Sequence, residues 1–121
     1  MNANAMYLLP KGIEVSANVF GRQGYPYPLF RSQALGGETL SVLVTPTIVY
    51  FRYDNVWDTD VRAARAFTLR TVSLRVIGDV FNVFNANTVL VRNNNILATT
   101  FNQIGQNLSP RILRVGVQVR F

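Results

Sequence analysis

The last eleven residues, 111–121, constrain the fold of this chain more than any other stretch. They read RILRVGVQVRF, and from residue 113 onward apolar side chains alternate with arginine, glycine or glutamine until Phe121. A period of two places the apolar side chains on one face of a β-strand and Arg114 and Arg120 on the other. Soluble antiparallel sheets can show this pattern. A transmembrane strand requires it over roughly 9–11 residues, because one face meets lipid and the other meets the barrel lumen.

Similar alternation recurs earlier in the chain. The expected strands cover residues 2–9, 13–20, 57–67 and 72–80. Between the first two we expect a tight turn at residues 10–12, where proline and glycine supply the special backbone angles. Between the next two we expect a short turn at residues 68–70. The pattern predicts an all-β fold, an antiparallel meander of about five long strands.

The connections between these strands alternate in length. Two are short turns, whereas residues 21–55 and 82–110 form long, irregular, glycine- or asparagine-rich segments. Residues 40–51 have strand-like composition, but Pro46 interrupts them, so the first segment is expected to be a loop with some extended stretches. Outer-membrane barrels have short periplasmic turns and longer extracellular loops. The alternation therefore favours the last five strands of a transmembrane β-barrel over a soluble meander.

Aromatic residues mark both ends of the expected strands. Near the short turns and the terminus lie Tyr7, Phe67 and Phe121. Near the long loops lie Phe20, Trp57, Phe81 and Phe84. Transmembrane barrels carry such aromatic girdles at both membrane–water interfaces. Aromatic residues are also common in strands of any kind, so this signal supports the barrel without being specific to it.

Charged side chains fall almost entirely on the polar faces of these strands. We expect the following residues to face the lumen: Asp58, Asp60, Arg62, Arg75, Asp79, Arg114 and Arg120. An arginine facing lipid at mid-membrane costs roughly 2–4 kcal/mol, which a wet lumen avoids. Arg65 is the exception, since it shares the apolar parity. It lies close to Phe67, where its long side chain could reach the interface.

The residue types leave little room for catalysis. The chain has no cysteine and no histidine, which excludes thiol nucleophiles, the usual zinc sites and imidazole acid–base chemistry. Asp58 and Asp60 could bind a cation or act as acid and base. Without a further acidic cluster, we interpret them as a lumen-facing pair balanced by Arg62, and Asp79 with Arg75 as a structural pair. We predict no enzymatic activity, no cofactor and no metal site.

The charge balance is basic, with a formal net charge of +6. Because the arginines are spread along the chain without a basic run, we predict no nucleic-acid partner. A soluble β-rich binding module for an acidic or nucleic-acid partner is the alternative reading. Tyr25, Tyr27 and Phe30, beside Arg22 and Arg31, could contact a ligand or simply pack the loop against itself.

Four segments resemble a known family. Residues 75–95, RVIGDVFNVFNANTVLVRNNN, resemble the late strand and last extracellular loop of TonB-dependent outer-membrane receptors, particularly the Oar-like group. Residues 51–67, with Asp60 and Arg62, resemble the preceding strand, and residues 7–28 the turn and strand before it. Residues 108–121 are similar to the final strand, and the resemblance implies that Phe121 is the signal for the barrel-assembly machinery.

The resemblance implies that residues 1–121 are the C-terminal portion of a receptor barrel in the cell outer membrane. The parent receptor would take up a large or scarce substrate by energy-coupled transport. The implied partners are outer-membrane lipid, the remaining strands and plug of the parent receptor, and the barrel-assembly machinery. TonB would be contacted only through the plug, which this chain lacks.

Five strands are too few for a closed barrel. Members of the family have about 22 strands, and single-chain barrels begin at about eight. An open sheet edge in hydrocarbon leaves backbone N–H and C=O groups without partners. Residues 1–10 also carry no signal peptide. We therefore expect a C-terminal fragment of a longer reading frame or a truncated gene product, with oligomeric closure as the alternative.

Overall fold

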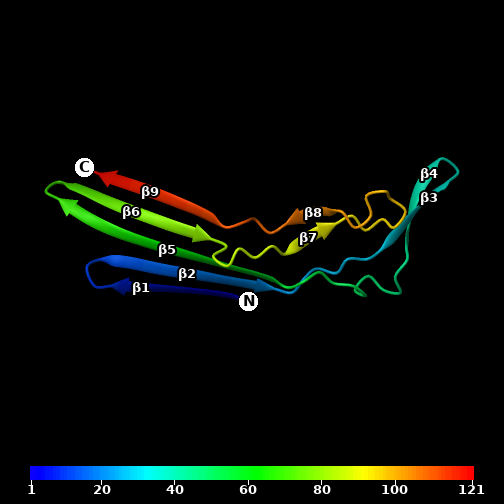
Figure 1. Cartoon of the computed structure of the whole chain (residues 1–121), viewed down its shortest axis with the longest axis horizontal. Coiled ribbons are helices and arrows are strands. Elements are labelled where there is room, and N and C mark those ends of the chain that lie inside the picture. Colours follow the sequence, from blue (N-terminus) through cyan, green and yellow to red (C-terminus); the bar gives the residue numbers. More distant parts are fainter. The chain divides into compact units, whose positions relative to one another are not determined.

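The computed structural model describes residues 1–121 and contains β-strands but no helix (Figure 1). The strands are β1 (Asn2–Leu9), β2 (Ile13–Arg22), β3 (Phe30–Leu35), β4 (Glu38–Leu43), β5 (Val56–Leu69), β6 (Val72–Phe81), β7 (Val89–Arg92), β8 (Ile104–Asn107) and β9 (Ile112–Arg120). The predicted all-β class is therefore confirmed. No segment forms a helix with the length and apolar character needed to cross a membrane.

The chain divides into two compact units. The sheet unit comprises residues 1–22, 57–86 and 109–121, and the loop unit comprises residues 23–56 and 87–108. The sheet unit holds one five-stranded sheet with the order β1-β2-β5-β6-β9. Pairing is antiparallel between β1 and β2, between β5 and β6, and between β6 and β9. These are the five long strands that the sequence predicts, in chain order.

The two short turns of the sheet differ in how well they were predicted. The first lies at residues 10–12 as expected, between the paired Leu9 and Ile13. The second turn lies at residues 70–71 rather than at the predicted residues 68–70, because β5 continues to Leu69, which pairs with Val72. Its two-residue connection has Arg70 in the left-handed region, with φ of 54°. A period-two pattern fixes the faces of a strand but not the residue at which the strand ends.

The loop unit is more regular than predicted. Residues 36 and 37, both glycines with φ of 60° and 90°, connect β3 and β4 as a hairpin. Strand structure ends at Leu43, and residues 45–51 form turns and bends despite their strand-like composition. In this stretch the Thr45 hydroxyl donates to the carbonyl of Thr47, a local bond that competes with a sheet ladder. Residues 82–110 are likewise not wholly irregular, since they include the antiparallel pair β7 and β8.

The strand register divides the sheet into two faces of opposite character. On the apolar face, Val76 pairs with Val117 and Val80 with Leu113. None of these side chains is buried: Val80 is partly exposed, and Leu113 is 75% exposed. The only buried hydrophobic residues in the chain are Val56 and Ala64. The sheet therefore has no hydrophobic core of its own, which is unusual because packed layers normally bury one face of a sheet.

Candidate functional site

The polar face of the five-stranded sheet carries the charged residues that the sequence singles out. Alternate positions of neighbouring strands meet there, with Asn4 opposite Asn18, Arg62 opposite Asp79, and Asp79 opposite Arg114. Because cross-strand partners share a face, these side chains form a row that crosses the strands. A hollow of about 390 Å³ lies beside this row.

Asp79 is the centre of the row. It is only 6% exposed, and its two oxygens accept from different strands. Arg62 Nε donates to Oδ1 at 2.5 Å, and Arg114 Nε and Nη2 reach Oδ2 at 2.8 Å. The Arg114 guanidinium also lies 5.0 Å from the centre of the Phe81 ring. Hydrogen bonds between ionised groups are stronger than neutral ones, so this carboxylate ties β5, β6 and β9 together.

Arg75 has a different partner from the one predicted. The expected pair with Asp79 is wrong, because Arg75 Nη2 instead donates to Glu14 on β2. Arg75 lies on β6, and β5 separates β6 from β2. The residue of β5 that pairs with Arg75 is Ala66. The small alanine leaves space for the arginine to extend across the central strand. The sequence placed Glu14 on a polar face but gave no sign of this long-range pairing.

Asp58 and Asp60 do not form the expected pair balanced by Arg62, whose Nε is engaged by Asp79. Asp60 accepts from the Asn18 side chain at 3.5 Å and from the backbone N–H of Asn82 at 3.1 Å. Oδ1 of Asp58 is buried without a hydrogen-bond partner. No three His, Cys, Asp or Glu side chains are grouped so that they could hold a metal ion.

Asn82 is a structural residue that sequence reasoning missed. It is 3% exposed and adopts a left-handed φ of 48° at the end of β6. Its Nδ2 donates to the carbonyls of Ala86, at 2.9 Å, and Ser109, at 2.7 Å, while its Oδ1 accepts from the Ala86 N–H. Asn85 is also left-handed, and its Oδ1 accepts from the Arg111 N–H. The asparagine-rich motif could have indicated this role, since asparagine tolerates the left-handed backbone conformation.

Two large side chains lie on the apolar face, and the sequence suggested the position of one of them, Arg65. The Arg65 guanidinium lies 4.7 Å from the centre of the Phe67 ring, so the one arginine on this face extends toward an aromatic residue. Trp57 packs over Gly21, where an added Cβ would lie 2.5 Å from the indole ring. Phe121 is fully exposed, and Arg120 lies opposite Ser73 at the end of β9.

The candidate ligand-contacting residues of the first loop are not brought together as a set. Tyr27 stacks on Phe51 and Tyr53, with ring centres 5.6 and 4.5 Å apart, which favours a packing role for Tyr27. Arg31 is engaged on its own strand with the side chain of Gln33. Phe30 begins β3 and pairs with Leu43.

Comparison with known proteins adds no relative, since no family model, curated protein or solved structure matches this chain. Membership of the TonB-dependent receptor family therefore stays a prediction. The function has to be inferred from the geometry of the sheet and of its side chains.

Proposed function

We propose that residues 1–121 form the C-terminal portion of a transmembrane β-barrel that belongs to a TonB-dependent outer-membrane receptor of the Oar-like group. In this role the chain contributes wall strands to a receptor that performs energy-coupled uptake of a large or scarce substrate. The observation that carries the proposal is the contrast between the two faces of the sheet. One face is apolar and uncovered, and the other gathers the charges into pairs.

The uncovered apolar face supports lipid as its solvent. In water, each square ångström of exposed apolar surface costs about 25 cal/mol compared with burial. Monomeric soluble proteins rarely expose apolar patches of more than a few hundred Å². Here the exposed large hydrophobic residues include every odd-numbered position of β9 from 113 to 119. Hydrocarbon removes this cost without a second protein layer.

The polar face supports a wet lumen. The Asp79 carboxylate lies between Arg62 and Arg114, and Arg75 is paired with Glu14. The arginine side chains remain about half exposed, which suits a water-filled or plug-filled interior. The single arginine on the apolar face, Arg65, contacts Phe67. Facing outward at mid-membrane would cost an arginine roughly 2–4 kcal/mol, so this distribution of charge agrees with a lipid-facing apolar side.

The dimensions and edges of the sheet agree with the same proposal. Its strands contain 8 to 14 residues, compared with the roughly 9–11 that a tilted transmembrane strand needs. The outer strands of the sheet are β1 and β9, and their arrows point the same way in Figure 1. Each edge needs a further strand, because hydrocarbon offers no hydrogen bonds. The remaining strands of the parent receptor would supply those partners.

A flotation experiment tests the proposal with the full chain and phosphatidylcholine vesicles. We expect the chain to bind the vesicles through its apolar face and to float with them, without the urea resistance of a closed barrel, because its two sheet edges stay unpaired. Val117→Arg places a charge on the apolar face, and the matched variant Gly116→Arg places it one residue away on the polar face. An added Cβ at Gly116 meets no atom within 4 Å. We expect Val117→Arg to reduce the bound-to-free ratio about 30-fold or more and Gly116→Arg to change it by less than about threefold.

Two outcomes would overturn the proposal. One is a wild-type chain that stays folded and monomeric in buffer without detergent or vesicles. The other is an equal loss of vesicle binding in both arginine variants, because the two faces would then not differ in their solvent. A soluble binding module for an acidic partner would be the better reading in the first case.

A further inference from the structure

Two adjoining hollows in the loop unit carry a second kind of chemistry. They measure about 250 and 170 Å³, and both are lined by Tyr27, Arg92 and Asn102. All of their lining residues belong to the loop unit. Pockets for drug-sized ligands are roughly 300–1,000 Å³. A groove of this size therefore suits one or two small rings rather than a large ligand.

The first hollow presents hydrogen-bond donors. Arg52 uses Nη1 on the carbonyl of Gly24, at 3.1 Å, and Arg92 uses Nη1 on Asn102 Oδ1, at 2.9 Å. Each guanidinium keeps Nε and Nη2 for another acceptor, since the side-chain hydrogen bonds of both arginines are made by Nη1 and neither arginine forms an ion pair. The fork of a guanidinium matches the two oxygens of a carboxylate. Two arginines at one small hollow therefore favour an oxyanion.

The side-chain amides around the groove also have their acceptors occupied. Asn94 Oδ1 accepts from the Tyr53 hydroxyl at 3.3 Å, and Asn102 Oδ1 accepts from Arg92. The Nδ2 groups of both asparagines remain as donors. Hydroxyl oxygens on a ligand can accept from them, whereas a plain hydrocarbon ring cannot. With these amide donors, the groove favours an anionic ligand that also carries hydroxyl groups over a simple anion.

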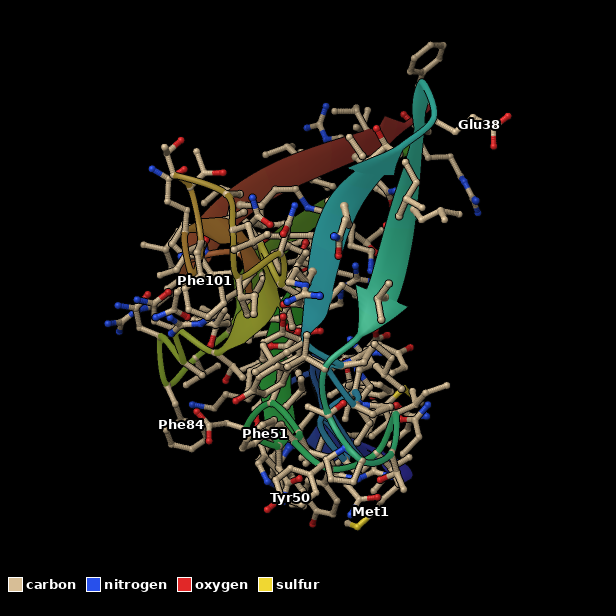
Figure 2. The ribbon with its side chains drawn as sticks, turned by 90° about the vertical axis from the view of Figure 1, so that its right-hand side faces the viewer. Met1, Glu38, Tyr50, Phe51, Phe84 and Phe101 are labelled. Carbon is tan, nitrogen blue, oxygen red and sulfur yellow. The ribbon has the colours of Figure 1, made fainter.

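The second hollow adds apolar ring surface. Its walls include Phe51 and Phe101, which are 37% and 43% exposed, together with Leu29. Tyr50 meets Phe51 edge to face, and both are labelled on the loop unit in Figure 2. Exposed aromatic side chains supply large, rigid contact area at low conformational-entropy cost. The C–H groups of a sugar ring fit such a wall while its hydroxyls face the amides.

We propose that this groove of the loop unit binds an acidic sugar. The sugar carboxylate is held by Arg52 and Arg92, its hydroxyls by Asn94 and Asn102, and its ring by the aromatic wall. Asp54 also lines the first hollow and forms no ion pair in the chain. Its negative charge opposes an anionic ligand and limits the affinity. The inference goes beyond the proposed membrane role, because this binding requires no lipid.

Calorimetric titration of the full chain in dodecyl-dimethylamine-oxide micelles tests the inference, since that detergent has no sugar headgroup. The probes are trigalacturonate, neutral trigalactose and benzoate. We expect trigalacturonate to bind at least about tenfold more tightly than either of the others, because only it has both the carboxylate and the hydroxyls. Resonances of the Arg52 and Arg92 Nε–H groups should shift as it binds. Absence of binding, or equal binding of benzoate, would overturn the inference.

Three variants locate the site. Arg92→Gln should weaken trigalacturonate binding about tenfold, whereas Arg31→Gln, an exposed arginine elsewhere in the loop unit, should leave it within about twofold. Asp54→Asn removes the opposing charge without touching a hydrogen bond of the fold, so binding should tighten about threefold. If Arg92→Gln and Asp54→Asn both bind trigalacturonate with the affinity of wild type, the groove is not the site. Vesicle flotation of Val117→Arg is unaffected by any of these outcomes, so the two proposals can fail separately.

Discussion

The sheet unit and the loop unit satisfy their backbone groups in different ways. In the sheet unit, long antiparallel ladders pair the backbone, and side chains contribute a few charged contacts centred on Asp79. In the loop unit, hydrogen bonds from side chains connect segments that are distant in the sequence. The Tyr53 hydroxyl accepts from the Arg92 N–H, and Asn95 Nδ2 donates to the Ser32 hydroxyl. A periodic sequence is enough for the first arrangement, whereas the second depends on single residues.

The comparison predicts that single substitutions damage the loop unit more than the sheet unit. The two units can be followed separately by their chromophores, with the chain held in dodecyl-dimethylamine-oxide micelles for all of the urea experiments below. The only tryptophan, Trp57, lies in the sheet unit, and four of the five tyrosines lie in the loop unit. Tryptophan fluorescence therefore reports on the sheet, and tyrosine near-ultraviolet circular dichroism reports mainly on the loops.

Gly24→Ala should have the largest effect. An added Cβ would lie 1.8 Å from the carbonyl oxygen of Tyr53, so the two backbone segments must separate. We expect a loss of about 3 kcal/mol or more in the loop unit. The tyrosine signal should unfold at lower urea, while the Trp57 signal stays unchanged. Gly116→Ala, where the Cβ meets open space, is the control; an equal loss in both variants would contradict the steric explanation.

Asp79→Asn is the strongest single change that we expect in the sheet unit. It removes the charge that holds Arg62 and Arg114 and leaves two guanidiniums unpaired. Urea unfolding followed by Trp57 fluorescence should show a fall in midpoint about twofold larger than that for Glu14→Gln, whose ion pair with Arg75 is more exposed. Equal falls would mean that Asp79 is not the centre of the polar row.

Asn82→Asp tests the junction at the end of β6. The replacement has the same shape but cannot donate, so the bonds to the carbonyls of Ala86 and Ser109 are lost. We expect a loss of about 2 kcal/mol, because two partly buried hydrogen bonds are lost. Hydrogen exchange should accelerate at Ala86 and Arg111. Asn87→Asp, at a neighbouring exposed asparagine, should have little effect; protection that survives in Asn82→Asp would contradict the assigned role.

The extent of sequence-based prediction follows the same division between periodic and irregular structure. The five long strands, their two faces and the shared face of Arg62, Asp79 and Arg114 were predicted, because each depends only on alternation. The partners of the charges were not. A turn at residues 68–70 would have placed Arg62 opposite Val76, whereas the later turn places it opposite Asp79. Register depends on turn geometry, which alternation does not encode.

The loop unit was less predictable for a related reason. Its close contacts join residues that are far apart in the sequence, such as Asn94 with Tyr53 and Asn95 with Ser32. Asparagine and tyrosine can make such bonds in many surroundings, so their presence does not specify a partner. The asparagine-rich motif was informative only about backbone conformation. Its hydrogen-bonded partners, and the groove beside Arg92, required the three-dimensional structure.

Arg70→Gly should produce the smallest effect and should act in the opposite direction. Arg70 occupies the left-handed region in a two-residue connection between Leu69 and Val72, where glycine has no steric penalty. We expect a gain of about 0.5–1 kcal/mol in the urea unfolding of the sheet unit, measured by Trp57 fluorescence. Arg111→Gly, a substitution of the same type outside the strands and outside the left-handed region, should not stabilise the sheet. A loss of stability in Arg70→Gly would mean that the arginine side chain contributes more to this turn than its backbone conformation costs.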